Sequence, residues 1–213
     1  MPLAAEPDHT GGRRADIHPS AAPVGAPPSP SIFSSGFPML IFIDFEASSL
    51  FSDSWPIEIG LARIEPDGTI SQTGRLIRPD PAWSETAWSP ESAEVHRIPR
   101  SALDDADPAA DVARWATDAI GDAVLISDAP EFDQRWLDRL LATRPGAPTL
   151  RIQDFDNAAW TVFVESRAGI SAALKAVYDT RARRRTTHRA AQDAADLAMS
   201  WRAGLRVLRR PGQ

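Results

Sequence analysis

Hydrophobic and polar positions along the chain predict alternating strands and helices from residue 39 onward. Short apolar runs bounded by polar or turn-forming residues are typical of buried strands. An unbroken apolar run comes first, and a Glu-Pro-Asp-Gly turn at residues 65–68 joins the next two strands. The predicted strands are Leu40–Phe45, Ile57–Ile64, Thr69–Ile77, Ala123–Ile126 and Thr149–Ile152.

Between and after these strands, apolar residues recur every three or four positions, which is the spacing of one helix face. The predicted helices cover Val112–Ile120, Phe132–Leu141, residues near 156–165 and 169–179, and a last helix from near His188 to about Leu205. Residues 79–106 are rich in loop-forming residues, with a short helix expected around Glu91–His96. This order predicts an α/β domain with a mixed five-stranded sheet flanked by helices.

Residues 1–38 follow a different pattern. Prolines recur through a stretch rich in alanine, serine and glycine, without apolar periodicity. Such a segment buries too little to offset the entropy of ordering, so we expect a disordered tail before a domain at 39–213. Met39 directly precedes the first strand and is a candidate translation start; the alternative is a flexible tail of unknown use.

Acidic residues stand at the ends of predicted elements. Asp44 and Glu46 end the first strand, and residues i and i+2 of a strand point to the same face. Asp133 lies at the start of one predicted helix, and Asp193 lies near the start of the last one, five residues after His188. Carboxylate oxygens suit Mg²⁺ or Mn²⁺, and the chain has no cysteine to offer thiolate ligands. Two such ions about 4 Å apart can promote hydrolysis of a phosphodiester, with a histidine taking the proton of the water.

At these residues the chain resembles the DEDDh branch of the DnaQ-like 3′–5′ exonucleases. The resemblance runs from the D-x-E of Asp44 and Glu46, through Phe132-Asp133, to the H-x-A-x-x-D of His188, Ala190 and Asp193. It covers roughly residues 39 to 205. It implies an RNase H-like fold and hydrolysis of single-stranded DNA or RNA from the 3′ end.

The resemblance also implies roles for individual residues. Asp44, Glu46 and Asp193 would bind one Mg²⁺ or Mn²⁺ ion, and Asp44 and Asp133 the second. His188 would be the general base. Leu50 matches the position that packs against the terminal base, and His96 lies in a segment similar to the family's V-H-G-I loop. The expected substrate contacts are Phe45, Ser48, Leu50, His96, Phe132 and Arg185.

Three departures from the family pattern concern the substrate side of the site. Ala47-Ser48-Ser49 stands where Thr-Thr-Gly is common, and Arg97 replaces the glycine of the V-H-G-I loop. Asp128 stands where relatives commonly carry asparagine, and it adds a negative charge near the expected scissile phosphate. The metal ligands are unaffected.

Two further patterns each allow two interpretations. Residues 181–185, Arg-Ala-Arg-Arg-Arg, precede His188 and could bind phosphates or form a solvated loop. Trp55, Trp83 and Trp88 lie in predicted loops, where they could stack on bases or pack in the core.

Charge and composition limit the class of protein. The 213 residues carry a net charge of -6, which argues against a protein that coats duplex nucleic acid through bulk electrostatics. No apolar stretch approaches the roughly 20 residues of a membrane span, and we expect a cytoplasmic protein without membrane partners. The sequence leaves the choice between monomer and homodimer open.

Several functions remain after this reasoning. The first is a 3′–5′ exonuclease, and a variant of it acts on short RNA or tRNA ends. The others are a catalytically weak nucleic-acid-binding module and a metal-dependent phosphomonoesterase. Retention of a general base beside four carboxylates favours an enzyme over a binding module.

Overall fold

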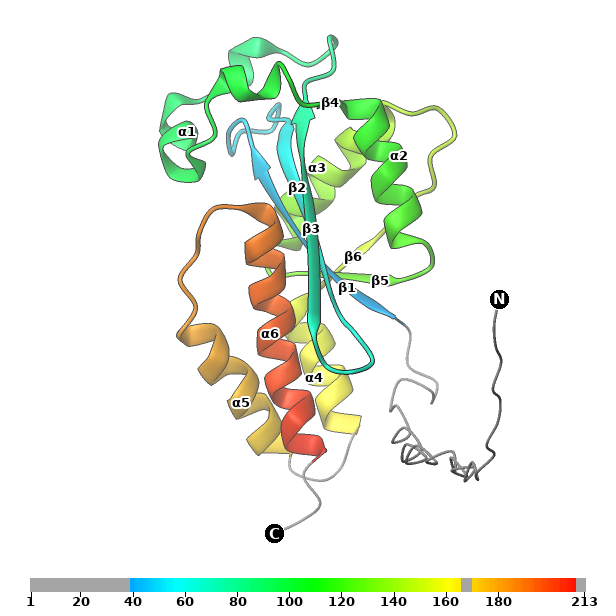
Figure 1. Cartoon of the computed structure of the whole chain (residues 1–213), viewed down its shortest axis with the longest axis vertical. Helices are drawn as coiled ribbons and strands as arrows, with labels where there is room; N and C mark the ends of the chain where they lie inside the picture. The colour runs from blue at the N-terminus through cyan, green and yellow to red at the C-terminus, as the bar shows by residue number, and fades with distance from the viewer. Residues whose placement is uncertain (1–38, 166–169, 210–213) are drawn as a thin grey trace, which may run out of the picture. The chain divides into compact units, whose positions relative to one another are not determined.

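A mixed sheet in the order β4-β3-β2-β1-β5-β6 forms the centre of the computed structural model, which describes residues 39–165 and 170–209 (Figure 1). The strands are β1 (Leu40–Ala47), β2 (Pro56–Ile64), β3 (Ile70–Arg78), β4 (Asp107–Pro108), β5 (Val124–Ser127) and β6 (Ile152–Asp154). The expected disordered tail, residues 1–38, lies outside the described ranges, and the start at Met39 stays a prediction.

The first three strands are antiparallel, and β5 and β6 run parallel to β1. The predicted turn between β2 and β3 is confirmed, with the Gly68 amide donating to the Glu65 carbonyl at 2.8 Å. The predicted sheet of five strands has a sixth, β4, which the sequence did not indicate because two residues carry no periodicity.

The last strand begins later than predicted. β6 starts at Ile152, whereas the apolar run indicated Thr149–Ile152. The Gln134 side chain explains the shift, because it donates to the Leu150 carbonyl at 3.1 Å and accepts from the Ile152 amide at 2.9 Å. Backbone groups before Ile152 are therefore bonded to a helix side chain, and pairing with β5 begins only at Ile152.

Helices cover both faces of the sheet (Figure 1). One face packs against α2 (Ala109–Ile120) and α3 (Pro130–Ala142), and the other packs against α4 (Phe155–Glu165) and α6 (Ala190–Leu208). The helix α5 (Ile170–Ala182) packs against α6 and α4. The predicted short helix is α1 (Pro90–His96), flanked by 3-10 turns at Glu85–Ala87 and Arg100–Leu103. In the described part of the chain, none of the helices is long and apolar enough to cross a membrane.

The beginning of α6 lies directly against β2. A Cβ atom on Gly60 would be 2.0 Å from the carbonyl carbon of Ala190, so only glycine leaves room for this approach. The contact brings the segment before α6, which contains His188, to the end of β1 and the beginning of β2.

Of the three tryptophans in predicted loops, Trp55 is fully buried in the core. Its ring stacks on Trp83 at a centroid distance of 6.1 Å and lies 5.9 Å from Trp88. The base-stacking interpretation is therefore wrong for Trp55, and core packing is confirmed.

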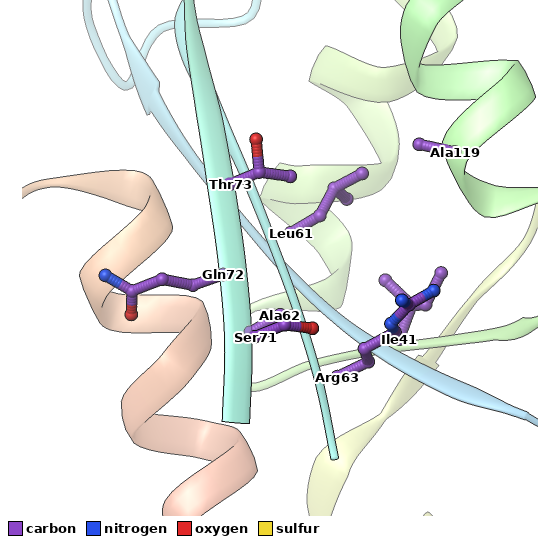
Figure 2. Close-up of a pocket in the computed structure, with 8 residues that line it drawn as sticks. All are labelled: Ile41, Leu61, Ala62, Arg63, Ser71, Gln72, Thr73 and Ala119. Atoms are coloured by element: carbon purple, nitrogen blue, oxygen red, sulfur yellow. The ribbon is translucent and has the colours of Figure 1, made fainter. Parts of the chain in front are cut away.

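A hollow of about 300 Å³ lies between β1, β2, β3 and α2 (Figure 2). Its lining contains no acidic side chain, and Arg63, its charged residue, pairs with Glu65 at 2.7 Å. Ile41 and Leu61 in its wall belong to the sheet face covered by α2 and α3. The hollow therefore does not contain the predicted metal ligands.

Candidate active site

The predicted carboxylates of β1 point to the face of the sheet that α6 covers. Strand alternation places Asp44 and Glu46 with Phe42, which packs under α6, and both carboxylates are partly exposed. Phe45 points to the opposite face, where it is buried with its ring 6.5 Å from Trp136. The Phe45 side chain is thus a core residue, and a contact with substrate could involve only its backbone.

Asp133 is 1% exposed in the first turn of α3. The Ser127 hydroxyl donates a hydrogen bond to Asp133 Oδ2, and the Phe45 amide also bonds this carboxylate. These bonds orient Asp133 toward the end of β1. Its charge acts directly on Asp44, whose pKa it helps to raise.

Asp193 lies in the first turn of α6 and accepts bonds from the segment that precedes the helix. The Thr187 amide donates to Oδ1 at 3.1 Å, and the His188 amide donates to Oδ2 at 3.0 Å. His188 itself has a φ of 55°, a left-handed conformation that is unusual for a residue other than glycine. Such a conformation persists where neighbouring contacts impose it.

Residues far apart in the sequence meet at this point. The ligand atoms of Glu46, His188 and Asp193 all lie within 4.8 Å of one another. The structure therefore brings the D-x-E of β1 together with the H-x-A-x-x-D at the start of α6. Asp133 is near enough to Asp44 for its charge to raise the pKa of Asp44.

Burial and mutual repulsion raise the pKa values of the carboxylates in this cluster. Burial, followed by the charge of Asp193, raises the pKa of Glu46 to about 8, although Arg189 opposes this rise. Burial also raises the pKa of Asp133 to about 7, against the Ser127 hydrogen bond. The pKa of Asp44 is well above its usual value, because of burial and then the charge of Asp133. Clustered carboxylates of this kind are stabilised as anions by a divalent cation, so the donor set fits Mg²⁺ or Mn²⁺.

Glu58 on β2 is a member of this site that the sequence reasoning missed. It is 5% exposed and lies opposite Glu46 in the register of β1 and β2. It accepts from Arg189 at 2.7 and 3.1 Å and from the Ala190 amide at 3.1 Å. The available signal was a single acidic residue inside the apolar run Pro-Ile-Glu-Ile-Gly of a predicted strand.

The predicted substrate contacts differ in exposure. Leu50 is 68% exposed and Phe132 is 37% exposed. Arg135 links the two, since it donates to the Leu50 carbonyl at 3.3 Å and its guanidinium lies 5.2 Å from the Phe132 ring. Arg185 is also exposed.

Ser48 and His96 are buried instead. The Ser48 hydroxyl accepts a bond from the Trp55 amide at 3.0 Å, and His96 Nδ1 accepts from the Ile98 amide at 3.0 Å. Burial lowers the pKa of His96. Both side chains therefore stabilise the loops around the site, and neither presents its bonded atom to solvent.

The arginine run is not a uniformly solvated loop. Arg181 and Arg184 both contact Asp128 Oδ2, at 3.3 and 3.2 Å, and Arg181 also pairs with Asp156 at 2.7 Å. Asp128, the departure from the family pattern, is thus balanced by two arginines from the same run. Arg183 and Arg185 are exposed.

Comparisons with known proteins give structural matches alone. No protein-family model and no curated protein matches the chain. A zinc-bound E. coli exonuclease I–ssDNA complex matches with a TM-score of 0.57 at 13% identity, over 81% of this chain and 41% of that protein. E. coli exonuclease I in complex with a dT13 oligonucleotide matches with a TM-score of 0.56 at 10% identity, over 78% of this chain and 40% of that protein.

Exonuclease X in complex with duplex DNA with a 5′ overhang matches with a TM-score of 0.48 at 23% identity, over 79% of this chain and 92% of that protein. The chain spans less than half the length of exonuclease I. At these identities the likeness concerns the fold alone, and it agrees with the predicted α/β fold with a mixed sheet flanked by helices.

Proposed function

We propose that the chain is a metal-dependent 3′–5′ exonuclease of the DEDDh type that acts on single-stranded nucleic acid. The observation that carries this proposal is the convergence of Asp44, Glu46, Asp133 and Asp193 with His188 at one end of the sheet. The fold shared with E. coli exonuclease I, which was determined with bound ssDNA, supports the choice of substrate class.

In this mechanism Asp44, Glu46 and Asp193 would hold one divalent cation, and Asp44 and Asp133 would hold the second. Two such cations, when bound, supply charge stabilisation for the phosphoryl group and lower the pKa of a bound water. The carboxylates must be anionic to bind cations, so the raised pKa values of Glu46 and Asp133 make cation binding weaker in acid.

His188 is the group that would accept the proton of the attacking water. Its ligand nitrogen lies within 4.8 Å of carboxylate oxygens of Glu46 and Asp193, so a water held by these carboxylates would be within its reach. Its backbone amide is fixed by Asp193, which limits the position of the ring.

The terminal nucleotide would contact the exposed side chains at the rim of the site. Leu50 and Phe132 both project into solvent, and apolar or aromatic side chains at such a rim can stack on bases. Arg135 holds the two close together. These side chains would contact a base by stacking and not by hydrogen bonds, so we expect no strong sequence preference.

The test is digestion of 5′-labelled single-stranded DNA and RNA oligonucleotides in Mg²⁺ and in Mn²⁺. We expect a ladder of products that shortens from the 3′ end. Asp44→Ala should abolish it, and His188→Ala should reduce the rate about 10²- to 10⁴-fold, the usual contribution of a general base. Asp118→Ala, which removes an exposed carboxylate of α2, serves as the matched control and should leave the rate unchanged.

The alternatives correspond to other outcomes of this assay. Digestion of short RNA alone would identify an exoribonuclease. Release of inorganic phosphate from nucleotides without shortening of oligonucleotides would identify a phosphomonoesterase. Binding of oligonucleotides without cleavage in either metal would identify a binding module and overturn the proposal.

A further inference from the structure

The segment that carries His188 depends on side chains for its position. Residues 183–189 connect α5 to α6, and their backbone bonds to α5 occur only at the start, where the amides of Arg183 and Arg184 donate to the carbonyls of Thr180 and Arg181 at 3.3 and 3.1 Å. From Arg184 onward, the side chains and amides of this segment bond to carboxylates on other elements, and the Arg189 carbonyl accepts from the first turn of α6.

The first of these carboxylates is Asp128, at the junction of β5 and α3. Its Oδ2 atom accepts from Arg184 at 3.2 Å and from Arg181 at 3.3 Å. The Arg184 and Asp128 side chains are 12% and 19% exposed, so this ion pair is largely shielded from solvent. It connects the beginning of the segment to the same junction that contains Ser127, the partner of Asp133.

The second carboxylate is Glu58 on β2, which holds the end of the segment. Arg189 donates to both oxygens of Glu58, and the Ala190 amide donates to Oε2. A two-contact pair between arginine and a carboxylate fixes orientation as well as distance. Glu58 is buried, so the contact sets where α6 begins relative to the sheet.

Between these two ion pairs lies the strained part of the segment. His188 has a φ of 55°, and a residue other than glycine keeps such a conformation only where the surrounding contacts impose it. Asp193 holds the amides of Thr187 and His188. The ion pairs of Arg184 with Asp128 and of Arg189 with Glu58 lie on either side of this position.

We propose that Asp128 and Glu58 are positioning residues for His188, which they hold beside Glu46 and Asp193 through Arg184 and Arg189. This inference rests on the proposed function, since it concerns the delivery of the general base. It assigns a role to Asp128 that the family asparagine at this place could not have, because an amide does not form an ion pair with arginine.

Asp128 and Glu58 could affect the reaction through their charge instead of through the position of His188. The two explanations predict different kinetics, so they can be separated. Asp128 raises the pKa of Asp44 and Asp133, and Glu58 raises that of Glu46. Removal of either charge should lower these pKa values and reduce the repulsion of an anionic substrate, so an effect of charge alone predicts a lower KM without loss of kcat. A positioning role predicts a lower kcat with an unchanged or lower KM.

The experiment is a double-mutant cycle with Asp128→Asn and Glu58→Gln, each in the wild-type and in the His188→Ala background. We expect kcat to fall about 10- to 100-fold in the wild type, as for a group displaced by about 1 Å. In the His188→Ala background, assayed in Mn²⁺ at high enzyme concentration, the same substitutions should change kcat less than about twofold, because nothing remains to be positioned. Asp179→Asn, which breaks the exposed pair with Lys175 on α5, is the matched control and should leave kcat unchanged.

Hydrogen exchange provides a readout that does not require activity. The amides of Thr187 and His188 should exchange faster in Asp128→Asn and Glu58→Gln than in the wild type, while α6 amides stay protected. Equal losses of kcat in both backgrounds, or unchanged kcat with unchanged exchange, would overturn the proposal. A wild type without nuclease activity would refute the proposed function, and exchange would then still decide whether the two ion pairs hold the segment. If the Glu58→Gln variant does not fold, the Asp128→Asn variant alone tests the proposal.

Discussion

Glu46 on β1 and Glu58 on β2 lie directly opposite each other in the antiparallel register. Like charges at such a cross-strand pair destabilise a sheet. Arg189 offsets part of the repulsion because it bonds to Glu58 and lowers the pKa of Glu46. Burial and Asp193 nevertheless raise the Glu46 pKa to about 8, so the cation-free protein holds more protons than the unfolded chain.

The cation-free protein should become less stable as pH rises from about 5.5 to about 8. The folded pKa values of Glu46 and Asp133, about 8 and about 7, lie above their ordinary values of 4.5 and 3.8. The unfolded chain therefore loses these protons first, and the free energy of unfolding falls as pH rises through this window. Thermal unfolding in EDTA across this range measures the effect.

Addition of Mg²⁺ should raise Tm most at the alkaline end, where the carboxylates are anionic. Glu46→Gln should flatten the pH dependence in EDTA and should also reduce the Mg²⁺ effect. A Tm in EDTA that rises steadily from about pH 5.5 to 8 would contradict the raised pKa values.

Ser127→Ala should weaken cation binding near pH 7. The Ser127 hydroxyl donates to Asp133 and lowers its pKa, so its removal leaves Asp133 protonated to higher pH. Loss of a hydrogen bond to a charged group is worth about 1.5–3 kcal/mol, which corresponds to roughly a tenfold or greater loss of affinity. Titration calorimetry with Mg²⁺ at about pH 7 and about pH 8.5 should show a loss that shrinks at the higher pH.

Ser200→Ala provides the control for this experiment, because Ser200 is a buried serine that bonds a backbone carbonyl of α6. An equal loss of Mg²⁺ affinity in both variants would mean that Ser127 acts on packing and not on Asp133.

Arg183→Gln and Arg185→Gln should each raise KM for oligonucleotides and reduce its dependence on salt. Both residues are exposed, and no ion pair in the described part of the chain involves them. A lost phosphate contact on a single strand lowers the slope of log affinity against log salt by about 0.7. Arg151→Gln, an exposed arginine on the segment before β6, should leave the slope unchanged. An unaltered slope in all three variants would show that the arginine run does not contact phosphates.

Arg97→Gly should stabilise the protein. Arg97 ends α1 with a φ of 58° and donates its amide to the Ala93 carbonyl at 2.9 Å, a position that favours glycine. Relief of this conformation is worth about 1 kcal/mol, and chemical denaturation should show a higher midpoint with unchanged slope. Arg78→Gly, an exposed arginine at the end of β3 with ordinary backbone angles, should instead destabilise.

The sequence by itself was sufficient for features that depend on neighbouring residues. Strand alternation placed Asp44 and Glu46 on one face, and helical spacing placed Asp133 and Asp193 near the beginnings of their helices. The turn at residues 65–68 was also evident, because proline fixes φ and glycine allows the positive φ that Gly68 adopts. In each case the geometry is set within a few residues of the chain.

Only the tertiary structure decided which distant residues meet. Glu58 became part of the site through the register of β1 and β2, and Asp128 acquired Arg184 as a partner through the path of the segment after α5. The start of β6 depended on a side chain of α3, and Trp55 was buried by loops far from it in sequence. These contacts arise from the packing of whole elements against each other, and they cannot be predicted from the spacing of residues along the chain.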